Sequence, residues 1–324
     1  MEGPPTTEAL ASATNFSVSL TFKCCAILIG IVGVLANGTL LNALLSKNSM
    51  KKTVNIFITN QVTLDLFSCA ILSITFAVKS SCTQYVGTFG WLVCALFDSD
   101  MIISVGLTGS IVSLVLIAAE RYFLIVYPIL HKTQVKRWMI IALGTLPWLE
   151  GVVVNIPALW TSVVVDGACF SFYVWPNRAS QVAYSICMIL LTFFIPIAFN
   201  VFFYGSILLV VRQRSRVFQG HYVNQDMSTV LQTNAHRAEM NIISTMIIVS
   251  VAFAVCWFPG QIWYLLYDIQ YNVPNNDTFY CFSMFLMFLS ICINPCIYAA
   301  RLHPVKKKLQ GWVSKSVSPV VTLA

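Results

Sequence analysis

Charged residues are scarce in this sequence. Only 10% of its 324 residues are Asp, Glu, Lys or Arg, while 58% are hydrophobic. In soluble globular domains about a quarter of the residues are charged, so the shortage excludes an ordinary water-soluble globule and indicates a chain whose solvent is mostly lipid. The net charge of +7 is better explained by membrane topology and attraction to anionic lipid than by a nucleic-acid-binding patch.

Catalytic and metal-binding constellations are also missing. The sequence has no cluster of metal ligands, no Ser/His/Asp set and no phosphate-binding loop, so we do not expect an enzyme. A transporter is the alternative from another class, but the internal repeat and the row of paired charges that it would need are missing too. The histidines fall in connectors between hydrophobic segments and are expected to be solvated: His131, His221, His236 and His303.

Hydrophobic segments long enough to cross a bilayer occur seven times. A hydrocarbon core of about 30 Å needs roughly twenty apolar residues in a helix. The segments that meet this length run over residues 20–45, 54–78, 91–124, 135–159, 181–211, 241–269 and 278–300. Prolines inside several of them are tolerated because neighbouring helices satisfy the freed carbonyls. The sequence predicts an all-α integral membrane protein, a seven-transmembrane helix bundle over residues 20–300.

The segments outside this bundle are short. Residues 1–19 are rich in Thr, Ser, Ala and Pro and show no cleavable signal peptide, so we expect a disordered N-terminal tail. Residues 301–324 begin with alternating basic and apolar residues. This pattern predicts a short amphipathic helix on the cytoplasmic surface of the membrane after span seven.

Basic residues are distributed unevenly about the spans. With the N-terminus outside, sixteen of the nineteen Lys and Arg residues fall on the cytoplasmic side, the exceptions being Lys23, Lys79 and Arg178. Because Lys and Arg accumulate in cytoplasmic loops, we expect a multi-pass plasma-membrane protein with an extracellular N-terminus and a cytoplasmic C-terminus. The glycosylation sequons at Asn15 and Asn276 then both lie outside.

Two of the eleven cysteines are distinguished by their position. Most cysteines lie within spans, where a thiol is simply a small apolar group. Cys94 at the outer mouth of span three and Cys169 in the outer loop after span four instead face an oxidising compartment. We expect a disulfide between them. The remaining pair near the outer surface, Cys82 and Cys281, is the candidate for a second bridge.

An aspartate lies near the middle of span two. A charge within the bilayer costs roughly 3 kcal/mol or more, which makes Asp65 a candidate functional residue. Oxygen-bearing side chains on other spans would complete a site for a small hard cation such as sodium: Asn37, Ser110, Ser290 and Asn294. A protonated or water-bridged structural aspartate is the alternative.

Short motifs occur at matching places in all seven spans. They are Gly33-Val34-Leu35-Ala36-Asn37 in span one, Leu64-Asp65 in span two, Glu120-Arg121-Tyr122 at the end of span three, Trp148 in span four, Pro196 with Tyr204 in span five, Cys256-Trp257-Phe258-Pro259 in span six and Asn294-Pro295-Cys296-Ile297-Tyr298 in span seven. Their order and separations resemble those of class A, or rhodopsin-like, G-protein-coupled receptors over nearly the whole chain.

The resemblance implies a role for Arg121. In this family the arginine is held by acidic partners in the resting state, here Glu120 beside it and Glu239 near the start of span six. Its release lets span six move outward, and the hydroxyls of Tyr204 and Tyr298 would then turn toward it. The alternative is an interfacial arginine that merely reaches toward lipid phosphates.

The resemblance also implies which residues transmit the signal and which meet the heterotrimeric G protein. The core switch would be Ile111, Pro196 and Phe253, the floor of the ligand pocket Trp257, and the hinges of spans six and seven Pro259 and Pro295. Proline loosens a helix because it removes a backbone hydrogen bond. The G protein would contact Arg121 together with Pro128 and Ile129 of the second inner loop.

The ligand is less well defined by the sequence. Span seven has Phe288 where retinal-binding pigments have a lysine, so we expect no retinal, and the sodium ion is the only bound group considered. Amine receptors have an aspartate at the position of Ile103; however, Cys94 and Arg121 are twenty-seven residues apart against a usual twenty-five, and a shifted register would bring Asp100 closer to the cavity. Other candidates for the pocket wall are Met101, Met188, Thr192, Trp257, Gln261 and Tyr264. A neuropeptide-like ligand is favoured, with an amine or another small molecule as the alternative.

Overall fold

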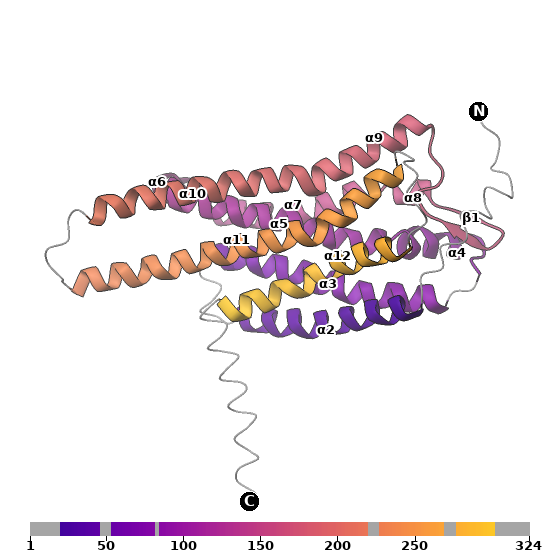
Figure 1. Ribbon diagram of the computed structural model, residues 1–324, viewed down its shortest axis with the longest axis horizontal. Helices are drawn as coiled ribbons and strands as arrows, with labels where there is room; N and C mark the ends of the chain where they lie inside the picture. Colours follow the sequence, from indigo (N-terminus) through magenta and orange to yellow (C-terminus); the bar gives the residue numbers. More distant parts are fainter. Residues whose placement is uncertain (1–19, 46–52, 82–83, 220–226, 269–276, 302–324) are drawn as a thin grey trace, which may run out of the picture.

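Long helices form most of the molecule. The computed structural model describes residues 20–45, 53–81, 84–219, 227–268 and 277–301, and Figure 1 shows a bundle of helices with a small sheet at one end. Seven helical segments in these ranges are long and apolar enough to cross a membrane, so the expected seven-transmembrane bundle is confirmed. Asn15, Asn276 and the expected amphipathic helix after span seven lie outside the described residues.

Several of the spans are built from more than one helical element. In chain order they are α2 (Leu20–Leu44), α3 (Thr53–Ser81), α4 with η1 and α5 (Gly87–Val93, Cys94–Asp98 and Met101–Val126), α7 with α8 (Arg137–Asn155 and Ala158–Thr161), α9 with η2 and α10 (Arg178–Ile189, Leu190–Phe194 and Ile195–Gln219), α11 (Met227–Asp268) and α12 (Asp277–Arg301). The short helix α6 (Pro128–Gln134) follows α5. Pro259 and Pro295 lie inside α11 and α12, as prolines do in membrane helices.

The third span is irregular where it begins. After α4 the chain makes a π-helical turn, η1, in which the amide of Ser99 donates to the carbonyl of Cys94 at 3.0 Å. Asp100 then has a φ of 57°, in the left-handed region, and α5 starts at Met101. A π turn holds an extra residue, and the left-handed step interrupts the helix. The spacing from Cys94 to Arg121 is two residues longer than the twenty-five that are usual in class A receptors. The π turn and the left-handed residue together accommodate these two residues.

A β-hairpin at one end of the bundle was not anticipated from the sequence. β1 (Val163–Val165) pairs antiparallel with β2 (Ala168–Phe170). The two residues between them, Asp166 and Gly167, have φ of 51° and 78°. Positive φ at both positions is the geometry of a two-residue hairpin turn, and Asp-Gly is one of its commonest sequences.

The hairpin is attached to the third span. A disulfide joins Cys169 in β2 to Cys94 in η1, which confirms the expected bridge, and the indole of Trp91 donates to the carbonyl of Ser162 at 3.2 Å. We call this the hairpin end of the bundle. The opposite end, where the last turns of α5 carry Arg121, is called the arginine end.

Glycines allow α5 and α7 to approach closely. A Cβ atom on Gly151 would lie 2.2 Å from the backbone oxygen of Val105, and one on Gly109 would lie 2.7 Å from the backbone oxygen of Pro147. Small residues permit such contacts between membrane helices. Gly144, also in α7, differs because a Cβ atom there would have nothing within 4 Å.

Replacing Gly151 with alanine should destabilise the bundle. The added methyl group overlaps the backbone of Val105, and overfilling a packed interior typically costs about 1–3 kcal/mol. We therefore expect a lower melting midpoint for the purified protein in detergent. Gly144→Ala is the matched control, because alanine favours a helix over glycine by about 0.5–1 kcal/mol and has room there. Equal midpoints for the two variants would contradict the packing described.

Candidate functional site

The arginine end contains a buried ion pair. Arg121 donates to both carboxylate oxygens of Glu120, from Nε to Oε2 at 2.6 Å and from Nη2 to Oε1 at 3.0 Å. The two residues are only 5% and 8% exposed. A bidentate, charge-assisted pair of this kind is stronger than a surface ion pair. The arginine is therefore held by its neighbour and does not reach toward the lipid surface.

The other residues expected to take part in coupling to the G protein differ in burial. Tyr122 packs against Phe202 and Phe203 of α10, with ring centroids 5.7 and 5.3 Å apart. Pro128 and Ile129, expected at the G-protein surface, are exposed at the start of α6. Glu239 falls within α11, but its side chain lies outside the described part of the structure.

His131 was missed by the sequence analysis. It was expected to be solvated, which is wrong: its side chain is only 15% exposed, and Nε2 lies 3.7 Å from Oε1 of Glu120. The carboxylate of Glu120 therefore faces two cationic or potentially cationic groups. The available signal was Pro128, because a proline at the first position of a helix starts a turn that brings His131 back toward α5.

The two tyrosines of the arginine end are buried in different environments. The hydroxyl of Tyr298 donates to Oε1 of Gln61 on α3 at 2.9 Å, and Tyr298 is fully buried. The hydroxyl of Tyr204 is buried and has no hydrogen-bond partner among the described residues. The structure therefore leaves the hydroxyl of Tyr204 available as a donor, while that of Tyr298 on α12 is bonded to α3. The hydrogen bonds described for the Arg121 side chain go to Glu120.

Polar side chains surround Asp65 at the middle of the bundle. Its Oδ1 accepts a hydrogen bond from Ser110 at 2.7 Å, and its Oδ2 accepts one from Nδ2 of Asn294 at 2.9 Å. Asn37 instead donates to the backbone oxygens of Gly33 and Ile291 at 3.0 and 3.1 Å. The structure therefore brings together three helices around one carboxylate.

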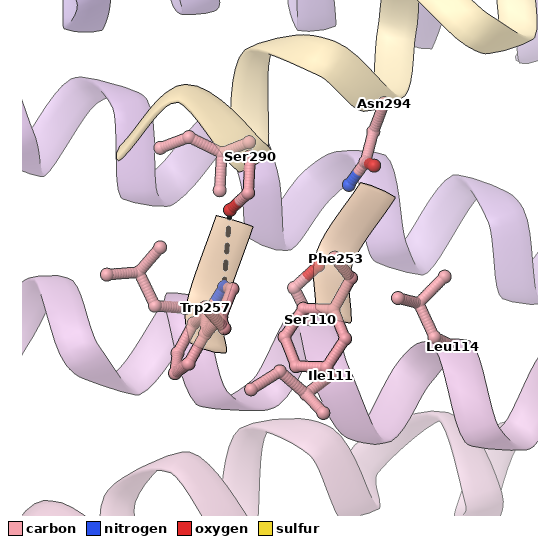
Figure 2. A pocket seen from close by; sticks show the side chains of 9 residues that line it. Ser110, Ile111, Leu114, Phe253, Trp257, Ser290 and Asn294 are labelled. Carbon is pink, nitrogen blue, oxygen red and sulfur yellow. Dashed lines mark hydrogen bonds between the residues drawn. The ribbon is translucent and has the colours of Figure 1, made fainter. Parts of the chain in front are cut away.

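A small cavity adjoins this polar group. Figure 2 shows Ser110 and Ile111 of α5, Phe253 and Trp257 of α11, and Ser290 and Asn294 of α12 around it. Its volume is about 10 Å³, and one ordered water needs roughly 10–15 Å³. A water or a small ion fits there, whereas an organic ligand does not. A hard cation prefers oxygen ligands. Carboxylate, hydroxyl and amide oxygens all lie near this cavity, so the residues fit sodium.

Two residues of the expected core switch, Ile111 and Phe253, line the same cavity. Phe253 packs against Trp257 with ring centroids 5.3 Å apart, and the indole of Trp257 donates to Oγ of Ser290 at 3.3 Å, as Figure 2 shows. Pro196 is buried in α10, and its carbonyl accepts from Nδ2 of Asn200 at 2.9 Å. Asn200 also accepts from Ser250 at 3.4 Å, which connects α10 to α11.

The residues expected to bind ligand differ widely in burial. Met101, Ile103, Thr192, Gln261 and Phe288 are buried, Met188 is half-buried and Tyr264 is exposed. The hydroxyl of Thr192 donates to the backbone of its own helix, at the carbonyl of Met188. The hydroxyl of Tyr264 donates to the sulfur of Met284 at 3.5 Å. An aromatic cluster lies at the hairpin end, where Tyr184 of α9 packs against Phe172 and Trp175.

Asp100 has an intramolecular partner. Its Oδ1 lies 2.8 Å from Nζ of Lys79 at the end of α3, and the two side chains are 21% and 17% exposed. Next to this pair, the hydroxyl of Tyr85 donates to Asp98. The carboxylate that was considered for binding an amine is therefore already paired with a cation of the chain itself.

Comparison with known proteins agrees with this arrangement. The family model for the 7 transmembrane receptor (rhodopsin family) matches residues 36–298. The chain belongs to the rhodopsin family of seven-transmembrane receptors. It is therefore a multi-pass membrane receptor. Receptors of this class signal to G proteins and are not enzymes.

Several relatives of this receptor are similar over most of its length. It is 27% identical over 300 residues to neuropeptide Y receptor type 6 of Oryctolagus cuniculus, an alignment that covers 86% of this chain and 76% of that one. It is 29% identical over 290 residues to the receptor of the same name from Mus musculus, covering 83% and 73%. It is 26% identical over 282 residues to the substance-K receptor of Bos taurus, covering 84% and 70%.

Asp65→Asn should remove the effect of sodium on the stability of the receptor. An ion that binds only the folded state raises the melting midpoint, and the substitution removes the charge that attracts it. We expect a higher midpoint for the parent in sodium chloride than in choline chloride at the same concentration, and no such difference in the variant. Ser113→Ala removes another buried hydroxyl of α5 and should keep the difference. A parent that does not respond to sodium would contradict this site.

Proposed function

We propose that this receptor lies in the plasma membrane with its hairpin end and N-terminus outside and its arginine end and C-terminus in the cytoplasm. It binds a neuropeptide-like ligand at the hairpin end and activates a heterotrimeric G protein through outward movement of α11. The buried Glu120–Arg121 pair is the observation that carries this proposal. The distribution of basic residues and the disulfide at the hairpin end, which needs an oxidising compartment, support the orientation.

The ion pair defines the resting state in this mechanism. Glu120 satisfies two donors of Arg121, and we assign Glu239, in the cytoplasmic part of α11, as the second acidic partner. Removing one partner of a buried pair typically costs about 3–5 kcal/mol, because the other charge is left uncompensated. Arg121 therefore stays withdrawn until new partners are offered. The G protein binds the cytoplasmic face at Arg121, Pro128 and Ile129. Its surface provides new partners that stabilise the released conformation of the arginine.

Movement is transmitted through the hydrogen bonds of α11 and α12. Ligand binding above Trp257 changes its contact with Ser290 and the position of Phe253, which packs against Trp257 and lines the cavity with Ile111; Pro196 on α10 is the third residue of this switch. The kinks that Pro259 and Pro295 permit let the cytoplasmic halves of α11 and α12 move relative to their outer halves. Tyr204, whose buried hydroxyl has no partner among the described residues, gains one by turning toward Arg121, and Tyr298 does so after leaving Gln61.

A peptide ligand is favoured over an amine. The relatives compared above are receptors named for neuropeptide Y and substance K. An amine that used Asp100 would have to displace Lys79, which holds that carboxylate at 2.8 Å. The buried cavity beneath Trp257 has room for a water or an ion only, so the ligand binds farther out, among the aromatic residues of the hairpin end.

Glu120→Gln should raise signalling in the absence of ligand. Glutamine keeps the shape of the side chain but removes the charge that holds Arg121, so the released state becomes more populated. We expect a several-fold rise in basal second-messenger output at equal surface expression, and a similar rise for Glu239→Ala. Arg301→Gln, which changes an exposed arginine bonded to Ser244 at the same end, is the control and should behave as the parent. A lack of coupling in every variant, with any G-protein class, would refute the proposed coupling.

The ligand class can be separated with two substitutions of one ion pair. A screen of peptides and amines should yield a peptide agonist whose response persists in Asp100→Asn. Lys79→Gln removes the competing cation but leaves the carboxylate, so an amine that binds Asp100 would become more potent in that variant and inactive in Asp100→Asn. That pair of results would overturn the peptide proposal in favour of an amine receptor.

A further inference from the structure

Two buried cysteines from different spans meet near the centre of the bundle. Cys69 lies on α3 and Cys292 on α12, and both are free thiols. A Cβ atom placed on Gly33 of α2 would lie 2.3 Å from the sulfur of Cys69 and 2.9 Å from the sulfur of Cys292. The two sulfurs therefore border the same space, the one that a side chain at Gly33 would fill.

The surroundings hold both thiols in place. Nδ2 of Asn37 donates to the sulfur of Cys69 at 3.7 Å, and the sulfur of Cys292 donates to the backbone oxygen of Ile29 at 3.4 Å. Cys69 is 0% exposed and Cys292 is 9% exposed. Metal binding is the less suitable chemistry here, because no group of three or more His, Cys, Asp or Glu side chains gathers among the described residues.

We infer that Cys69 and Cys292 form an oxidisable dithiol, which hydrogen peroxide converts to a disulfide that joins α3 to α12. One sulfur attacks the peroxide, the O–O bond breaks, and a sulfenic acid and one water form. The second sulfur then attacks the sulfenic sulfur, the S–O bond breaks, and the disulfide and a second water form. The two thiols lose two electrons and the peroxide gains them.

The position of the pair suits this chemistry. Peroxide is small and uncharged, so it can enter an apolar interior. The product carries no charge and no S–H group that needs a partner, which is favourable where polar groups are costly. Because both sulfurs border the space at Gly33, closing the bond to its length of about 2.05 Å does not require distant parts of the fold to meet.

The disulfide would stabilise the resting arrangement, an effect that rests on the proposed function. Two hydrogen bonds already join the same two helices, from Asn294 to Asp65 and from Tyr298 to Gln61. A covalent bond between α3 and α12 adds to them and opposes the movement of α12 during activation. Oxidation is therefore expected to lower signalling, and a thiol reductant is expected to restore it.

The chemical part is tested on the purified receptor in lipid nanodiscs. After treatment with hydrogen peroxide, the remaining thiols are alkylated, the protein is digested, and the peptides are identified by mass spectrometry. We expect a peptide linked through Cys69 and Cys292, formed in addition to the Cys94–Cys169 linkage that is present before treatment. If alkylated peptides of Cys69 and Cys292 persist at peroxide concentrations that oxidise exposed Cys187 and Cys296, the proposal is overturned.

The regulatory part is tested in cells that express the Glu120→Gln receptor, whose basal signal needs no ligand. Peroxide should lower this signal at least twofold, and the decrease should be absent when Cys69→Ala or, separately, Cys292→Ser is added at equal surface expression. Cys256→Ala, which changes another buried thiol, should retain it. A linked peptide without any change in signal would overturn the regulatory role. No basal signal in any variant would count against the proposed function, and the peptide analysis would still decide the site.

Discussion

The burial of opposite charges in an interior of low dielectric is the constraint on which the rest of this receptor depends. Glu120 and Arg121 are both almost fully buried, and each is tolerable there because it neutralises the other. A conformational change that separates them must provide replacement partners at the same time. This requirement explains why one short motif at the end of α5 can govern the position of helices that are distant in sequence.

The helix α12 connects the polar groups at different depths of the bundle. It contacts α11 through Ser290 and Trp257, and it contacts α3 through Asn294 and Tyr298. A movement of α12 therefore changes the cavity beside Asp65 and the environment of the arginine end together. Two further features would act on α12, because both lie where it meets its neighbours. One is an ion or a water in that cavity, and the other is a covalent bond near Gly33.

Much of the fold could be predicted from composition and spacing, and the remainder depended on local backbone geometry. The seven spans and the Cys94–Cys169 bridge followed from hydrophobic length and from the compartment that each cysteine faces. The irregular start of span three was visible only as two extra residues, because sequence spacing does not say whether a bulge or a shifted register accommodates them. The hairpin had a usable signal, since Val163–Val165 is followed by Asp166 and Gly167 and then by a second apolar run.

The candidate site shows a similar division. Motif spacing located Asp65 and Arg121, but not the groups that contact them through tertiary structure. His131 meets Glu120 only because α6 turns back toward α5, and the partner of Asp100 comes from α3. Such contacts depend on how loops return to the bundle, for which sequence periodicity carries no information.

Restraint of α11 by the pair of Glu120 and Arg121 can be measured as a distance between α6 and α11. Spin labels at Thr133 in α6 and Asn241 at the arginine end of α11, both exposed, would report that distance by double electron–electron resonance after the exposed native cysteines are replaced. We expect a longer distance in Glu120→Gln than in the parent, without ligand. Identical distance distributions in the two proteins would contradict it.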